Sequence, residues 1–281
     1  MFSRSAVLDQ QRAWARSQGL KVDARGYVEP VAANLFAPIS LMASSAFSRG
    51  SGGELRQRER RPAKMRALHS SAALAVNVFD FWSNRASEPL ALALGVDSAI
   101  RTLTFEAQFR TRLRGTPPNL DVAVELADGC VLAIESKFIE WLARKSARGP
   151  VFNSAYSPMD GSLWLELGLP HCHELAVALQ QGSTRYEHLD ARQLLKHMLG
   201  LATQRPGKWS LLYLYYDVCG PEGEQHRHEL ADFACRLGPT VPFGALRYQT
   251  LIRSLSKDCV GDEAIRYTAW LRDRYSIAPV V

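Results

Sequence analysis

The stretch from Leu120 to Lys137 constrains the fold of this chain more than any other, because it alternates apolar and other residues on both sides of an Asp-Gly pair. The apolar residues share one face of each extended segment: Leu120, Val122, Val124, Leu126, Leu132 and Ile134. Asp128-Gly129 favours a tight turn, since both residue types tolerate positive φ. The pattern predicts two antiparallel strands joined as a β-hairpin.

The register of this hairpin decides whether its charged residues meet. Directly opposed residues of an antiparallel pair point to the same side of the sheet. A symmetric two-residue turn would direct Asp121 away from Glu135, whereas an odd loop sets it opposite Glu135 or Lys137. The odd loop also places both apolar rows on one buried face, and three-residue loops that end in a left-handed glycine are common. We therefore expect Asp121, Glu135 and Lys137 to cluster.

Such a cluster has a chemical meaning. Two carboxylates at the polar edge of a sheet suit Mg²⁺, which binds through one or two carboxylates and keeps several waters. Lys137 lies two residues after the second carboxylate. It can orient or deprotonate an attacking water, or stabilise the charge of a phosphate under attack. The alternative is a solvated hairpin face that carries an incidental Glu-Lys pair.

The arrangement resembles the PD-(D/E)XK nuclease superfamily, which has the restriction-endonuclease-like fold. The matching residues are Pro118-Asn119-Leu120-Asp121 and Glu135-Ser136-Lys137, with two residues between the proline and the aspartate where the minimal motif has none. The resemblance implies that Asp121, Glu135 and the Ser136 carbonyl bind Mg²⁺, for which Mn²⁺ can substitute. It implies that Lys137 acts on the nucleophile or on the transition-state charge. The wider pattern of NLD, IESKF and QLLKH is similar to uncharacterised bacterial proteins described as restriction-endonuclease-like.

Two flanking segments extend this candidate site. The alternation over 103–109 predicts a strand before the hairpin, on which Glu106 either joins the carboxylate face or is simply exposed. A helical pattern covers 185–204. In the superfamily the helix after the Glu-x-Lys strand often directs a glutamine toward the site, and Gln193 matches it, with Lys196 or His197 as helpers. The alternative is a helix shoulder that faces solvent.

The remaining patterns predict an α/β fold, and the resemblance implies that its central sheet is mixed. Its core has the order helix, strand, strand, strand, helix, strand, which is the order of the restriction-endonuclease-like core, and additional helices flank it. The other expected elements are helices over 6–18, 64–85, 223–237, 245–257 and 262–275, a buried strand over 209–218 and a loop over 44–54. We expect one nuclease-like domain over 1–281, with its core at about 64–218. Residues 1–63 would form an N-terminal extension and 219–281 a C-terminal helical decoration.

Charge and cysteine content narrow the setting. The net charge of +6 favours an anionic partner without identifying it. The densest basic run, over 56–64, either contacts phosphates or forms a solvated face. Five scattered cysteines without a CxxC pair indicate reduced thiols and a cytoplasmic protein. No apolar run approaches the roughly 20 residues of a membrane span, and the N-terminus does not read as a signal peptide.

The sequence thus predicts a Mg²⁺-dependent endonuclease that acts on nucleic acid, with double-stranded DNA as the expected partner and a homodimer as a compatible arrangement. One alternative is a non-catalytic module of the same fold that binds nucleic acid or assembles with partners. Another is a metal-dependent hydrolase of a small phosphorylated substrate. From the sequence alone, Asp121→Ala or Lys137→Ala should abolish cleavage and leave thermal stability nearly unchanged.

Overall fold

The structure is a computed structural model, and it describes residues 4–50, 53–59, 61–114, 117–143, 152, 156 and 159–275. A five-stranded mixed sheet lies at its centre, with the strand order β1-β2-β3-β4-β5. The strands are β1 Ile100–Gln108, β2 Asn119–Leu126, β3 Val131–Lys137, β4 Trp209–Tyr215 and β5 Phe243–Arg247. The pairs β1–β2 and β2–β3 are antiparallel, whereas β3–β4 and β4–β5 are parallel.

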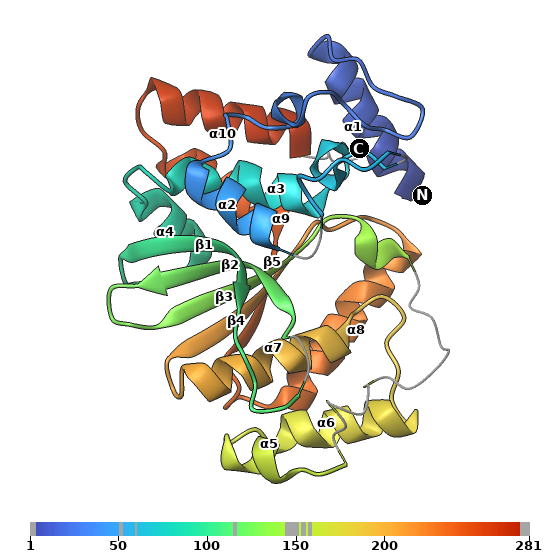
Figure 1. The fold of residues 1–281 in the computed structure, drawn as a ribbon, viewed down its shortest axis with the longest axis vertical. Helices are drawn as coiled ribbons and strands as arrows, with labels where there is room; N and C mark the ends of the chain where they lie inside the picture. Colours follow the sequence, from blue (N-terminus) through green and yellow to red (C-terminus); the bar gives the residue numbers. More distant parts are fainter. Residues whose placement is uncertain are drawn as a thin grey trace.

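Helices cover both faces of this sheet, as Figure 1 shows. On one side lie α1 Arg4–Ser17, α2 Leu41–Arg49, α3 Ser71–Phe79, α4 Glu88–Leu94, α9 Tyr248–Asp258 and α10 Asp262–Tyr275. On the other lie α5 Ser162–Glu166, α6 Pro170–Gln181, α7 Ala191–Gln204 and α8 Pro221–Leu237. Each side has its own apolar core. The protein is therefore a three-layer α/β structure, which confirms the predicted α/β class with a mixed sheet.

The fifth strand is a difference from the predicted core. The sequence pattern placed 245–257 in a helix, but the chain forms β5 first and begins α9 at Tyr248. The strand is short and mostly half-buried or exposed, so its residues carry no alternating apolar signal. What defines it is a long-range contact, the parallel pairing with β4. β5 and α9 extend the sheet and its core beyond residue 218.

The helix expected over 64–85 is wrong in its extent. The chain forms a short 3-10 turn, η2 Lys64–Arg66, then α3, then η3 Asp80–Trp82. Between η2 and α3 the backbone bonds to a distant segment instead of continuing a helix, because the Leu68 N–H donates to the Gly26 carbonyl at 2.9 Å. Ser70 then caps α3 by accepting from the Ala73 N–H at 3.1 Å. A tertiary contact and a cap thus divide a continuous helical pattern.

The loop expected over 44–54 is wrong for residues 44–49, which lie in α2, while residues 51 and 52 lie outside the described part of the chain. Ser40 caps this helix by accepting from the Ala43 N–H at 3.1 Å. The helix buries Ala43, Ala46 and Phe47, which recur at helical spacing. Its serine-rich composition indicated a loop, but burial of this apolar stripe outweighs the low helix propensity of serine.

The first and last described helices meet through one buried arginine. Arg274 of α10 has no exposed surface and donates to Gln11 Oε1 at 3.2 Å and to the Asn34 carbonyl at 2.7 Å. Its guanidinium lies 4.2 Å from the centre of the Trp14 ring. Both ends of the described chain are therefore tied to the same layer, and they lie close together in Figure 1.

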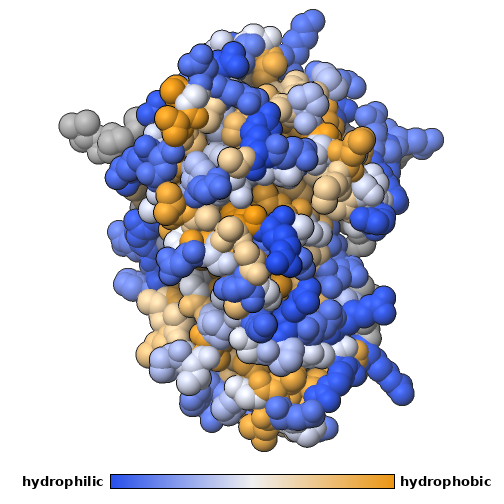
Figure 2. Space-filling model, turned by 90° about the vertical axis from the view of Figure 1, so that its left-hand side faces the viewer, coloured by the Kyte–Doolittle hydropathy of each residue, from blue (hydrophilic) through white to orange (hydrophobic). Residues whose placement is uncertain are grey.

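None of the helices in the described part of the chain is both long enough and apolar enough to cross a bilayer. The face in Figure 2 is mainly hydrophilic, and its hydrophobic residues are exposed in separate groups among charged ones. All five cysteines are free thiols.

Candidate active site

The β2–β3 turn has the odd loop that the apolar pattern predicted. The Leu126 N–H donates to the Cys130 carbonyl at 2.9 Å, which leaves three residues, Ala127 to Gly129, in the loop. Gly129 has φ +84°, where a side chain would be strained. Val122 therefore lies opposite Ile134. The predicted register is confirmed.

β2 and β3 separate at Asp121 and Glu135, the pair that would follow Val122 and Ile134 in this register. Pairing between β2 and β3 ends at Val122 and Ile134, although β3 continues beside β4 as far as Lys137. In the gap, the Asp121 carboxylate accepts the Ser136 N–H at 2.7 Å. A side chain thus takes the place of a backbone partner, and this divergence opens the sheet beside Glu135.

Both oxygens of Glu135 face cationic or titratable groups. Lys137 Nζ contacts Glu135 Oε1, and it also donates to Gln193 Oε1 at 3.3 Å. On the other side, His197 Nε2 lies 2.9 Å from Glu135 Oε2, without hydrogen-bond angles between the two atoms. The predicted residues Asp121, Glu135, Lys137 and Gln193 therefore come together. Lys196, the other predicted helper, instead lies over the Tyr156 ring at 4.4 Å.

Burial and mutual charge shift the acids in opposite directions. Burial, followed by the charge of Glu135, raises the pKa of Asp121 well above its usual value. Burial also opposes ionisation of Glu135, but Lys137 and His197 outweigh it and lower the pKa of Glu135 to about 2. Burial disfavours the ammonium of Lys137, yet Glu135 and Asp121 raise its pKa above its usual range. One carboxylate is thus held ionised beside a cation, and its neighbour is held back from ionising.

Glu106 lies on this carboxylate face, which is one of the two alternatives that the alternation over 103–109 left open. It lies between the pairs Phe105–Val122 and Ala107–Leu120, opposite Asp121. Its φ of 52° is the one positive value among the described non-glycine residues. Such strain is common at functional sites. Burial raises the pKa of Glu106, and the charge of Glu135 adds to the shift, while a hydrogen bond from Asn119 at 2.6 Å opposes it.

Glu54 is a further acid near this face that the sequence did not indicate. Its side chain is 17% exposed, and its carboxylate lies 3.3 Å from Lys64 Nζ. Burial raises its pKa, with smaller contributions from Glu106 and Glu140. No local pattern connects Glu54 with β1, because their proximity depends on the path of the chain between α2 and α3.

The acids fit a divalent cation. Glu135 is buried and Asp121 is half-buried, their charges repel, and a cation would neutralise both. Within the described residues, Glu135 Oε2 makes no hydrogen bond of suitable angle, although His197 Nε2 lies 2.9 Å away, so a cation bound there would share this oxygen with His197. No cluster of three or more His, Cys, Asp and Glu side chains forms a metal site in that part of the chain. Two carboxylates would leave most coordination positions to water, as Mg²⁺ prefers.

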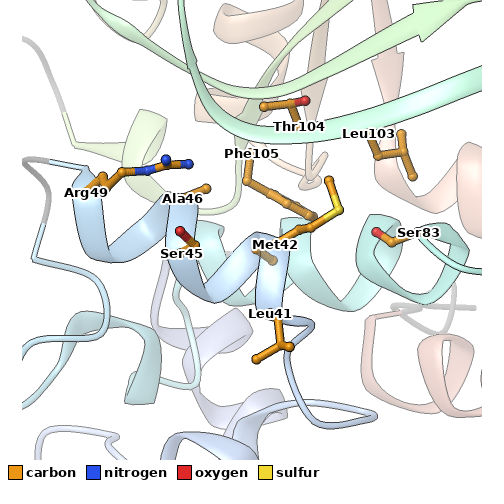
Figure 3. Close-up of a pocket in the computed structure, with 10 residues that line it drawn as sticks. Leu41, Met42, Ser45, Ala46, Arg49, Ser83, Leu103, Thr104 and Phe105 are labelled. Carbon is orange, nitrogen blue, oxygen red and sulfur yellow. The ribbon is translucent and has the colours of Figure 1, made fainter.

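The apolar cavity between α2 and β1 is separate from this site. It has a volume of about 290 Å³, and Figure 3 shows Leu41, Met42 and Phe105 among its lining residues, with Arg49 at the last turn of α2. None of the predicted site residues lines it. Its chemistry is therefore not that of the carboxylate cluster.

Helix α8 positions the start of α7 and hence Gln193. The Glu229 carboxylate accepts the N–H groups of Glu187, His188 and Leu189 at 2.8, 2.9 and 2.8 Å. These residues were expected to be helical, but α7 begins only at Ala191. The three bonds hold the backbone in another conformation, and the helix follows from there.

Glu229→Ala is expected to destabilise the protein by about 2–4 kcal/mol, because two buried N–H donors and one half-buried donor lose a charged acceptor. Urea unfolding monitored by circular dichroism measures this change. Glu224→Ala, an exposed position on the same helix, is the matched control and should stay within about 0.5 kcal/mol of the wild type. Equal stability of the two variants would contradict the role of Glu229.

Fold and site together define an α/β protein with a cluster of acids, a lysine and a glutamine where its central strands diverge. The chain belongs to the family described as restriction endonuclease associating with ARP, whose sequence model matches residues 12–276. No curated protein and no solved structure matches the chain.

Proposed function

We propose that this protein is a metal-dependent nuclease of the PD-(D/E)XK type, which hydrolyses phosphodiester bonds of DNA. The observation that carries the proposal is the meeting of Asp121, Glu135 and Lys137 at the point where β2 and β3 separate. The family description, restriction endonuclease, supports nucleic acid as the substrate class. The complete set of Asp, Glu and Lys argues against a non-catalytic module, since loss of an acid is the usual sign of an inactive site in this superfamily.

The acids are assigned to a cation. Asp121 and Glu135, with the Ser136 carbonyl, would hold Mg²⁺ or its substitute Mn²⁺. When bound, this ion supplies a water of lowered pKa and offsets the charge of the phosphate. Glu106, opposite Asp121, adds negative potential to the same face and would hold water molecules around the ion.

Lys137 is assigned to the phosphate charge. Of the roles open to it, proton abstraction requires a neutral amine, whereas charge stabilisation requires the ammonium. Glu135 and Asp121 raise the pKa of Lys137, so the ammonium is favoured. Gln193 Oε1 accepts from Nζ at 3.3 Å and fixes the position of the charge. Lys137 is therefore suited to the negative charge that develops on the phosphate during hydrolysis.

Cleavage of a supercoiled plasmid tests this proposal. Purified protein with about 5–10 mM Mg²⁺ or Mn²⁺ is expected to convert the plasmid to nicked and linear forms. EDTA is expected to stop the conversion, because the carboxylates need a cation to activate water. Gel electrophoresis over time gives the rate, with p-nitrophenyl phosphate as a comparison substrate. A protein that hydrolyses only the small phosphate ester, or neither substrate, would contradict the nuclease assignment.

A further inference from the structure

A basic arm extends from the chain beside the carboxylate face. The Met65 N–H donates to the Glu54 carbonyl at 3.0 Å, and Arg58 and Arg61 exchange backbone hydrogen bonds at 2.9 and 3.0 Å. The two contacts share one antiparallel register, so residues 54–59 and 61–65 run side by side as an irregular hairpin. We call the stretch 54–65 the basic arm. Its base is closed near Glu54, and Arg58 pairs with Arg61 farther along it.

The base of the arm lies next to the candidate active site. Lys64 contacts Glu54 at the base, and its charge lowers the pKa of Glu106, against the larger effect of burial. Gly50, which ends α2, lies so close to Glu106 that an added Cβ would be 2.9 Å from its Oε2 atom. Glu106 in turn lies opposite Asp121. The arm therefore begins at the same end of the sheet as the acids.

The arm concentrates the positive charge of the protein. Its twelve residues include five basic and two acidic side chains, a net charge of +3 out of +6 for the whole chain. Arg56, Arg58 and Arg61 are exposed. Arg56 donates to the Ser48 carbonyl at 2.7 Å, and among the described residues none of these three arginines pairs with a carboxylate. A solvated structural face would offset such charges with acids, as Arg236 is offset by Asp232 at 2.9 Å on α8.

We infer that the basic arm binds the phosphate backbone of duplex DNA and holds it against the carboxylate face. This inference rests on the proposed nuclease function and names the surface that the substrate occupies. Guanidinium groups match phosphate geometry with paired donors. Four residue steps from Glu54 to Arg58 span about 13 Å. Duplex DNA presents about eight phosphates over that length, so each arginine has a phosphate within reach.

The test is duplex binding by an arm variant in which Arg56, Arg58 and Arg61 are all replaced by alanine. Fluorescence anisotropy of a labelled 20-base-pair duplex (about two helical turns) is measured in EDTA over a range of salt concentrations, so no cleavage is needed. Each lost phosphate contact lowers the slope of log K against log salt by about 0.9. The arm variant is expected to lose a slope of about 2–3 and at least tenfold in affinity at about 0.1 M salt.

The matched control removes the same charge from the other end of the sheet. Arg101, Arg205 and Lys208 are exposed and lie at the β2–β3 turn end, where the Val131 N–H donates to the Lys208 carbonyl. Their triple alanine variant is expected to bind duplex DNA within about threefold of the wild type, since a general charge effect is small when no contact is lost. Thermal denaturation checks that both triple variants remain folded.

The outcomes separate the arm from the nuclease activity. If the arm variant binds duplex DNA with the affinity and salt slope of the wild type, or if the control loses as much, the arm assignment is overturned, whatever the cleavage assay shows. If wild-type binding depends on the arm but no plasmid is cleaved with Mg²⁺ or Mn²⁺, the arm assignment stands and the nuclease proposal fails. A wild type that does not bind duplex DNA overturns the arm as well.

Discussion

Replacement of Asp121 by asparagine is expected to abolish Mg²⁺-dependent cleavage and, at the same time, to stabilise the fold. The loss should be about a thousandfold or more, because several kcal/mol of transition-state stabilisation depend on the cation that this carboxylate would hold. The gain in stability follows from burial beside Glu135, which raises the pKa of Asp121. The asparagine oxygen can still accept the Ser136 N–H, so the local geometry is kept.

The sign of the pH dependence follows from the raised pKa. Below the unfolded value of 3.8, Asp121 is protonated in both states and contributes nothing to the difference between them. As the pH rises from there through the folded pKa, the unfolded chain ionises more readily, and the wild type loses stability that Asp121→Asn does not lose. The melting temperature of Asp121→Asn should therefore exceed that of the wild type by more at about pH 8 than at about pH 4.

Cation binding provides the control for Asp121. Mg²⁺ in millimolar amounts should raise the melting temperature of the wild type, since a ligand that binds only the folded state stabilises it, and should not raise that of Asp121→Asn. Asp128→Asn, an exposed carboxylate in the β2–β3 turn, is the matched control and should respond as the wild type does. An Asp121→Asn variant that cleaves plasmid normally would contradict the role of Asp121.

The site was largely predictable because its register is a local property. The apolar rows on 120–126 and 131–134 can share one face only with an odd loop, and that choice brings Asp121 beside Glu135. Gln193 was assigned from the resemblance to the nuclease superfamily, on a helix that the apolar pattern predicts, and strand alternation gave Glu106 as one of two alternatives. Each of these signals lies within a single element or across one short turn.

The parts that were missed depend on contacts between distant segments. β5 forms because β4 offers it an edge, and no alternation marks it in the sequence. Glu229 fixes the chain some forty residues before it, at the start of α7. From the sequence alone, substitutions at Asp121 and Lys137 are expected to leave thermal stability nearly unchanged, and this stays a prediction. The structure leads to a different expectation, because both side chains are half-buried beside Glu135 and the pKa of each is raised, so their removal should change the free energy of unfolding.

The divergence of β2 and β3 links this stability argument to function. A continuous ladder would satisfy the Ser136 N–H with backbone and leave no space between the strands. Here the Asp121 carboxylate satisfies it at 2.7 Å, in a position where burial makes its charge unfavourable. Proteins commonly hold functional groups at a cost in stability. Replacement of Asp121 is expected to stabilise the fold, whereas replacement of Lys137 is expected to destabilise it. Loss of ordinary packing would destabilise the fold in both cases, so a stabilised Asp121 variant would identify a functional cost.

Lys137→Met is expected to destabilise the protein by about 3–5 kcal/mol at neutral pH and to lower cleavage by about 10²–10³-fold. The stability loss arises because Glu135 stays buried without its main cation, and the rate loss because the ammonium no longer meets the phosphate charge. In the wild type, the lowered pKa of Glu135 gives stability that is present above the unfolded value of 4.5 and is lost as the pH falls toward about 2. The difference between wild type and variant, measured by urea unfolding, should therefore narrow over that pH range.

The double variant Glu135→Gln/Lys137→Met distinguishes the pair from either residue alone. A neutral pair of similar shape removes the uncompensated charge, so most of the stability lost in Lys137→Met should return, as replacement of buried ion pairs by neutral groups shows. Cleavage should not return, because both the metal-binding carboxylate and the ammonium are then absent. If Lys137→Met unfolds at the same urea concentration as the wild type at about pH 7, the Glu135–Lys137 pair does not stabilise the fold. Recovery of stability without recovery of cleavage would show that the pair serves both the fold and the reaction.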